Sequence, residues 1–346
     1  RWVSEQFGHD GTQLAVAEML RSGTTCFNDM YFFPDVVAER VEAVGMRATV
    51  GMIVIDFPTV WAANADEYLE KGLALRDAWR GHERISTVFA PHAPYTVSDE
   101  PLEKIRTYAD EMDLRVHMHV HETAFEVNDA QQKTGKRPLE RLKDMGLLTP
   151  NFLAVHMTQL TDDEIATCAT HGVHVLHSPE SNLKLASGLC PVQRLVDAGI
   201  NVALSTDGAA SNNDLDMIGE MRTAAFIGKI AADDAAAVSA DTVLRMATLN
   251  GAEALGIADH TGSITPGKAA DLCAIDLDAI ETRPTFDPVA AVVYNASREQ
   301  VTDTWVAGQR LLTDRRLTTL DEADLRERAA DWQQKLAAQD QNEDSQ

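Results

Sequence analysis

The sequence predicts an α/β fold of the TIM-barrel type, followed by a small β-unit, and two observations support this. Seven short apolar runs alternate with amphipathic, helix-like stretches, which is the pattern of a parallel sheet with crossover helices. In such barrels the chemistry lies where the strands end. Polar residues stand at those ends here: Asp29, His92, His119, Glu122, His156, His177 and Asp207.

The strand-like runs number seven, one short of the eight strands that close a barrel of this type. Each run is short, largely apolar and bounded by polar or turn-forming residues. The predicted strands are residues 24–30, 47–55, 85–92, 115–121, 152–157, 174–179 and 201–207.

Helix-like stretches lie between these runs and carry signals at their ends. Thr161 followed by Glu164 has the spacing of a capping box at a helix start. Gly23 and Gly172 stand where helices are expected to end, because glycine readily forms C-terminal caps. The stretch 242–257 predicts one further helix.

The character of the sequence changes after residue 260. Residues 261–318 contain short strand-like runs separated by Gly and Pro turns, which predicts a small β-unit beside the barrel. Residues 319–346 predict a helix over 321–338 and a polar, frayed tail. We therefore expect a barrel over residues 1–260, the β-unit, and a C-terminal helix with its tail.

Composition and charge exclude several classes of protein. The net charge of −24 would repel a phosphate backbone, so no nucleic-acid partner is expected. No apolar run approaches the roughly 20 residues of a membrane span, and no signal peptide opens the sequence. Four widely spaced cysteines indicate reduced, mostly buried thiols: Cys26, Cys168, Cys190 and Cys273. We expect a cytoplasmic protein with no membrane partner.

The stretch RVHMHVHET, residues 115–123, places His117, His119 and His121 at alternate positions of one predicted strand. Because side chains alternate along a strand, the three imidazoles should share one face, which points into the lumen of a barrel. Neutral imidazole is a favoured zinc ligand. A single histidine there would more often be an ordinary buried residue, but Glu122 and Asp207 stand at neighbouring strand ends. The cluster therefore predicts a metal site.

Other strand ends leave two interpretations open. Asp207 is either a carboxylate that binds a metal and accepts a proton from its water, or a residue that caps the next helix. His156 and His92 each end a strand and, taken alone, could equally be structural. The Ser/Asn/Gly-rich loop 177–188 either orders the rim of a substrate site or is a plain loop.

These motifs resemble the amidohydrolase superfamily, and within it the family of 5'-methylthioadenosine/S-adenosylhomocysteine deaminases. The resemblance covers essentially the whole chain and implies a (β/α)8 metal-dependent hydrolase barrel with a small β-sandwich, of which residues 261–318 are the C-terminal part. It implies one divalent metal, Zn²⁺ first, with Fe²⁺ or another divalent ion as the alternative. Its motifs are RVHMHVHET, FLAVH, FAPHAPYTVSD, SPESNLKLASG, STDGAASNN and GSITPGKAADLCAID.

The resemblance also implies a role for each site residue. His119 and Asp207 are metal ligands, and Glu122, three residues after His119, is the acid/base. His156 assists the attacking water, and Asp207 accepts a proton. His92, with Glu122 and Asp207, contacts the nucleoside.

The family has an H-x-H at the end of its first barrel strand, which supplies two further metal ligands. This sequence contains H-x-H only within 117–121. His117 and His121 have no metal role by resemblance and are expected to line the lumen or to support the ligands. The missing strand and the missing H-x-H form one gap, so we expect an N-terminally incomplete sequence rather than an inactive one.

The activity implied is hydrolytic deamination of an adenine ring, giving an inosine-type product and ammonia. S-adenosylhomocysteine calls for a positioned arginine at its carboxylate, but residues 51–70 contain no Arg or Lys and offer Phe57, Val60 and Trp61. Arg47 should lie at the far end of its strand. We expect 5'-methylthioadenosine to be preferred, adenosine tolerated and S-adenosylhomocysteine poorer.

Two alternatives remain open from the sequence. One is another amidohydrolase, a deaminase or chlorohydrolase of the guanine or triazine type. The other is a metal-deficient, non-catalytic barrel subunit. For the nucleoside deaminase we expect a small-molecule substrate and a homo-oligomer.

Overall fold

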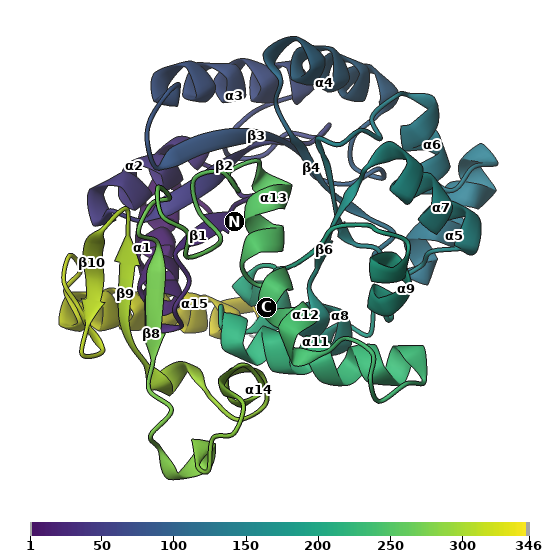
Figure 1. Cartoon of the computed structure of the whole chain (residues 1–346). Coiled ribbons are helices and arrows are strands. Elements are labelled where there is room, and N and C mark those ends of the chain that lie inside the picture. Colours follow the sequence, from purple (N-terminus) through teal and green to yellow (C-terminus); the bar gives the residue numbers. More distant parts are fainter. Residues whose placement is uncertain (1, 344–346) are drawn as a thin grey trace.

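The structure, a computed structural model, describes residues 2–343. Seven parallel strands curl into an incomplete barrel in the sheet order β1 to β7, with helices around its outside (Figure 1). All seven predicted strands are confirmed. They are β1 (Cys26–Asn28), β2 (Arg47–Val54), β3 (Ile85–Pro91), β4 (Val116–Val120), β5 (Phe152–His156), β6 (His174–His177) and β7 (Val202–Leu204).

Helices follow each strand of the barrel, as a parallel sheet requires. The capping box at Thr161 and Glu164 is confirmed, and Gly172 ends that helix in the left-handed conformation. The helices of the barrel part are α1 (Glu5–Arg21), α2 (Pro34–Val44), α3 (Ala65–Trp79), α4 (Asp99–Met112), α5 (Ala124–Thr134), α6 (Pro138–Asp144), α7 (Asp162–His171), α8 (Pro179–Lys184), α9 (Val192–Asp197), α10 (Ala209–Asn212), α11 (Met217–Ala232), α12 (Ala240–Met246) and α13 (Leu249–Leu255).

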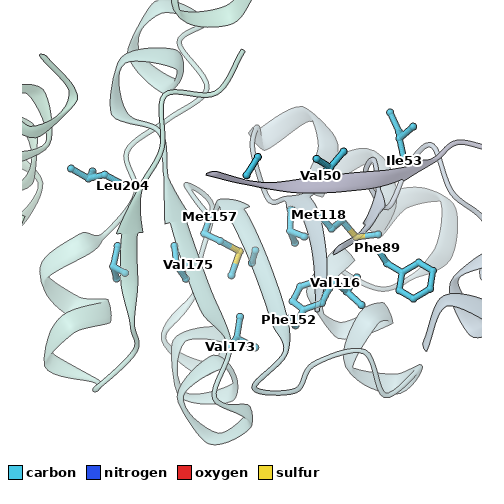
Figure 2. Close-up of a cluster of buried hydrophobic side chains, with 14 of the residues drawn as sticks. Val50, Ile53, Phe89, Val116, Met118, Phe152, Met157, Val173, Val175 and Leu204 are labelled. Atoms are coloured by element: carbon cyan, nitrogen blue, oxygen red, sulfur yellow. The ribbon is translucent and has the colours of Figure 1, made fainter. Parts of the chain in front are cut away.

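Alternation along the strands separates a helix-facing core from the lumen. On β4, Val116, Met118 and Val120 are fully or nearly fully buried, and Figure 2 shows Val116 and Met118 in the apolar cluster. Burying one such side chain contributes about 1.5–3 kcal/mol, so the apolar residues fix which face points outward. The intervening His117 and His119 are thereby directed to the lumen.

One predicted helix is wrong. The stretch 242–257 forms two helices, α12 and α13, which are separated at Thr248, where φ is −129° and ψ is −95°. Asn250 Nδ2 donates to the Val202 carbonyl at 2.9 Å and draws α13 against β7. Ala254 of α13 then packs on the inner apolar residues Leu153, Val155, Leu176 and Ala203. A tertiary contact therefore breaks the helix that local sequence favours.

The predicted β-unit is a four-stranded antiparallel sheet in the order β11-β10-β9-β8. Within residues 2–343 it is a single layer. Its strands are β8 (Leu272–Ile275), β9 (Val301–Val306), β10 (Gln309–Thr313) and β11 (Arg316–Leu317), and short helices η1 (Ile280–Thr282), α14 (Pro288–Tyr294) and η2 (Arg298–Gln300) connect β8 to β9.

The predicted C-terminal helix is confirmed as α15 (Glu322–Glu343), which runs into the segment expected to be a frayed tail. Residues 344–346 of that tail lie outside the described residues. Trp332 of α15 packs edge-on against Phe7 of α1 at 5.1 Å, and its indole N–H donates to Asp10 at 2.9 Å. The C-terminal helix is therefore fastened to the first helix.

Two further sequence expectations can be compared with the described residues. Among the helices of residues 2–343, none has both the length and the apolar character that crossing a membrane requires. The four cysteines are free thiols. Cys168 and Cys190 are buried, Cys26 is partly buried, and Cys273 is exposed, so the expectation of mostly buried thiols holds for the barrel only.

A buried ion pair ties the barrel to the small sheet, and it gives a stability prediction. Arg47, at the N-terminal end of β2, donates to Asp271 at 2.6 and 3.2 Å, and the two side chains are 9% and 0% exposed. Asp271→Asn should lower the free energy of unfolding by about 3–5 kcal/mol, because it leaves a buried guanidinium unpaired. Urea denaturation measures this change.

The control for this variant is Asp144→Asn, which breaks a solvent-exposed pair with Lys136. That change should leave the unfolding curve almost unaltered, since exposed pairs contribute little. Equal curves for the Asp271 and Asp144 variants would contradict the stabilising role of the buried pair.

Candidate active site

The predicted catalytic and metal-binding residues lie together at the carboxyl end of the barrel. His119 is on β4, Glu122 follows it, and His156 ends β5. The rings of His119 and His156 are nearly parallel, 5.4 Å apart, and the His92 ring is 5.1 Å from that of His119. His156 Nε2 is 3.8 Å from Glu122 Oε2. Burial lowers the pKa of His119 and His156, and Asp207, beyond β7, lies near enough for its charge to oppose that shift in both.

The tautomer of His119 is fixed by the neighbouring strand. Its Nδ1–H donates to the backbone carbonyl of His92 at 2.9 Å, which leaves Nε2 with a free lone pair. Burial lowers the pKa of His119, so the imidazole is neutral at pH 7. A hydrogen bond from the other ring nitrogen to a carbonyl is how proteins orient a metal-ligating histidine.

His156 is held in a similar way. It is 1% exposed, and its Nδ1–H donates to Asn182 Oδ1 at 2.9 Å. Burial lowers its pKa, so the ring is neutral and Nε2 can accept a hydrogen bond on the side that faces Glu122. His156 and Met157 both have left-handed backbone, with φ of 72° and 52°, a strained arrangement that concentrates at functional sites.

Asp207 is an ionised carboxylate at a strained turn, with φ of 61°. Oδ2 accepts the hydroxyls of Ser181 and Ser211 at 2.7 and 2.6 Å, and Oδ1 accepts the Gly208 N–H at 2.7 Å. Burial raises the pKa of Asp207, but these hydrogen bonds hold it below its usual value. Gly208, rather than Asp207, is the N-cap of α10, so the helix-cap alternative does not describe this side chain.

His92 stands at the edge of this cluster, toward solvent. Its Nδ1 is 3.0 Å from the Thr96 hydroxyl, and Tyr95, 59% exposed, meets its ring edge-on at 6.1 Å. Burial lowers the pKa of His92 to about 4, so it is a neutral hydrogen-bonding group at pH 7.

The three histidines of residues 117–121 do not all share one face, so that expectation is wrong for His121. His117 does face the lumen, where its Nδ1 lies 3.1 Å from Asn28 Nδ2, and burial lowers its pKa to about 3. β4 ends at Val120, and φ of 54° turns His121 away. Its Nε2 accepts the Leu139 N–H at the start of α6 at 3.2 Å.

Two other predicted strand-end residues are buried with unpaired atoms. Within the described residues, the two ring nitrogens of His177 have no hydrogen-bond partner, and the same is true of Asp29 Oδ2. Burial lowers the pKa of His177 to about 3 and raises that of Asp29 to about 6. Both side chains therefore hold buried polar atoms outside the hydrogen-bonded cluster.

Sequence reasoning did not identify the side chains that orient the cluster. The segment 177–188 is not a plain loop as expected, because Pro179–Lys184 form α8. Ser181 and Asn182 of this helix, and Ser187 after it, contact Asp207, His156 and Glu122 respectively. The Ser/Asn content of this segment is the only signal for these contacts in the sequence. In the structure the three residues orient Asp207, His156 and Glu122.

The donors present fit zinc in kind but not in number. An imidazole nitrogen and a carboxylate oxygen, from His119 and Asp207, are ligands that Zn²⁺ accepts. Among residues 2–343 no group of three or more His, Cys, Asp or Glu side chains is arranged to hold a metal. Catalytic zinc takes three protein ligands, so His119 and Asp207 by themselves are fewer than such a site requires.

Comparison with known proteins decides the family. A model of the amidohydrolase family matches residues 1–311. The chain belongs to the amidohydrolase family. It is thus a hydrolase that acts on C–N bonds. This amidohydrolase is 52% identical to the 5-methylthioadenosine/S-adenosylhomocysteine deaminase of Teredinibacter turnerae, over 98% of this chain and 76% of that protein. The corresponding deaminase of Haloarcula marismortui is 43% identical, over 93% of this chain and 74% of that protein.

Solved structures confirm the TIM-barrel fold of this amidohydrolase. An adenosine deaminase from Xanthomonas campestris with bound zinc superposes with a TM-score of 0.96 at 52% identity, covering 97% of this chain and 76% of that one. Atrazine chlorohydrolase from Arthrobacter aurescens, complexed with zinc, gives 0.88 at 24% identity, covering 94% and 77%. The second likeness concerns the fold alone.

Proposed function

We propose that this amidohydrolase removes the amino group of an adenine ring, with 5'-methylthioadenosine as its preferred substrate, adenosine tolerated and S-adenosylhomocysteine poorer. The observation that supports this most directly is that four side chains converge at one end of the barrel: His119, Glu122, His156 and Asp207. Neutral imidazoles, an ionised carboxylate and a second carboxyl group are the parts that hydrolytic deamination needs. The 52% identity to named deaminases agrees with the proposal.

The proton steps follow from the geometry. Asp207, ionised and held by two hydroxyls, accepts a proton from water as its oxygen bonds to C6 of the adenine ring. Glu122, beside His156 Nε2, delivers a proton to the ring nitrogen. In the collapse of the tetrahedral adduct, the amino group takes the proton held by Asp207 and leaves as ammonia when the C6–N bond breaks. The C6 hydroxyl returns its proton to Glu122 and becomes the carbonyl, so both carboxyl groups regain their starting state. The product is an inosine-type nucleoside.

The metal proposed is a single divalent ion, Zn²⁺, with His119 and Asp207 among its ligands. Such an ion lowers the pKa of a bound water to about 7. The chain's own contribution is to keep His119 neutral through burial, which lowers its pKa, and to orient its ring through the His92 carbonyl. Glutamate as the proton carrier is also the arrangement of zinc deaminases with a different fold.

The alternatives gain less support. Triazine and atrazine hydrolases share the fold at 24% identity or less, against 52% for the deaminases. A non-catalytic barrel would have no use for an ionised Asp207 on a strained turn beside three neutral histidines. The homo-oligomer expected from the sequence stays a proposal, and size-exclusion chromatography with light scattering tests it.

The substrate preference is a prediction about the segment after β2. Phe57 and Val60 are 51% and 58% exposed. Trp61 is buried against Tyr68, so it does not offer the apolar surface to the thioether that the sequence suggested. Arg47 is engaged by Asp271 at the opposite end of β2. Because a charge-assisted hydrogen bond contributes about 1.5–3 kcal/mol, kcat/KM for S-adenosylhomocysteine should be roughly 10–100-fold below that for 5'-methylthioadenosine. Steady-state assays of the three nucleosides measure this ratio.

Val60→Arg supplies a cation to this segment and serves as the comparison variant. The variant should raise kcat/KM for S-adenosylhomocysteine without a matching gain for 5'-methylthioadenosine. The kcat/KM values of the two nucleosides should therefore come closer together. A wild-type preference for S-adenosylhomocysteine would refute the assignment. Activity on guanine or an s-triazine alone would replace the proposed function by its runner-up.

A further inference from the structure

Glu126, in the first turn of α5, is a buried carboxylate that the proton steps do not use. It is 7% exposed and forms no ion pair with any residue between 2 and 343. Oε1 accepts the backbone N–H of His121 at 3.1 Å, and Oε2 accepts that of Glu122 at 2.8 Å. Burial raises the pKa of Glu126 to about 7, and the two N–H donors oppose that shift. A carboxylate is costly to bury unless its oxygens are satisfied in this way.

The two N–H groups belong to the turn that carries Glu122. His121 has left-handed backbone there, a conformation that persists in a residue with a side chain only when its surroundings hold it. The Glu122 carbonyl accepts the Thr158 hydroxyl at 2.7 Å, and its Oε1 is 3.4 Å from the Ser187 hydroxyl. Glu122 is therefore held at its N–H, its C=O and its carboxylate, each by a different side chain.

Thr158, which bonds to this turn, is closely packed against Gly188. Gly188 has φ of 139°, and a Cβ there would lie 2.8 Å from the Thr158 hydroxyl, so the loop packs directly on Thr158. The Thr158 N–H also donates to the His121 carbonyl at 3.0 Å. Thr158 is therefore held in place by Gly188 and donates to the carbonyl groups of the turn. Glu126 accepts the N–H groups of the same turn.

We propose that Glu126 is a positioning residue, which fixes the backbone of residues 121–122 and so aims the Glu122 carboxyl group at the substrate ring nitrogen. The inference rests on the proposed function and extends it to a residue outside the reacting groups. A displacement of about 1 Å in a reacting group can cost about 100-fold in rate, so a loosened turn should be visible in kcat.

The test is Glu126→Gln in the zinc-loaded enzyme. The amide keeps the size of the side chain but sets an NH₂ group against one of the two backbone N–H groups. kcat should fall roughly 10–100-fold, while KM and zinc content stay unchanged because no substrate or metal contact is lost. Hydrogen exchange at the His121 and Glu122 amides, followed by mass spectrometry, should be about 10-fold faster once their acceptor is weakened.

Glu140→Gln is the matched control, since Glu140 occupies the first turn of the next helix, α6, and is exposed. It should alter neither kcat nor exchange. Thr158→Val releases the other side of the same turn and should reproduce the fall in kcat at constant KM.

Three outcomes would overturn the inference: a Glu126→Gln protein that does not fold, a change in KM with kcat intact, or unaltered exchange at residues 121–122. Absence of deaminase activity in the wild-type enzyme would instead count against the proposed function. In that case the exchange measurement alone still decides whether Glu126 holds the turn.

Discussion

Replacing Glu122 by glutamine is expected to lower kcat by about 10²–10⁴, the usual contribution of general acid–base catalysis, and to leave zinc content unchanged. Glutamine has the same shape and can still accept the Ser187 hydroxyl that lies 3.4 Å from Oε1. It cannot take up and release a proton at pH 7, so the ring nitrogen would lose its donor. Steady-state kcat on 5'-methylthioadenosine and zinc per subunit by atomic absorption measure the two quantities.

Glu103→Gln makes the same chemical change on an exposed position of α4 and should leave both quantities as they are. If Glu122→Gln turned over at the wild-type rate, Glu122 would be no more than a carboxylate near the start of α5. If the variant lost its zinc, Glu122 would be a ligand and the separation of roles proposed for it would be wrong.

The positions of the site residues could be predicted from the sequence because they follow from topology. Parallel strands end at one edge of a sheet, so residues that follow apolar runs must converge there. His119, His156 and Asp207 come from β4, β5 and β7, and their proximity needs no knowledge of side-chain contacts. The apolar partners Val116 and Met118 fixed the outward face in the same way.

The orientation of those residues could not be predicted, because it depends on segments that meet only in the folded chain. Asn182 reaches His156 from 26 positions away, and Ser187 reaches Glu122 from 65. His121 departs from the strand alternation because its backbone is left-handed, and alternation describes extended backbone only.

Asp207→Asn should have the larger effect of the two substitutions, because it removes the proposed proton acceptor and a proposed zinc ligand at once. We expect zinc content to fall below one equivalent and kcat/KM to fall by at least the roughly 10²–10⁴ that a lost proton carrier costs. The neutral amide can still accept one of the hydroxyls of Ser181 and Ser211, so the turn itself should persist. Zinc per subunit and kcat/KM are measured on the same preparation.

Asp214→Asn removes the same charge seven residues later, where the carboxylate pairs with Arg298 at 3.3 Å, and it should change neither zinc nor rate. The two active-site substitutions then separate two functions of the carboxyl groups. Glu122→Gln should retain zinc without turnover, whereas Asp207→Asn should lose both, since of the two carboxyl groups only Asp207 is proposed as a metal ligand. Retention of full zinc and turnover by Asp207→Asn would show that this carboxylate only organises the turn before α10.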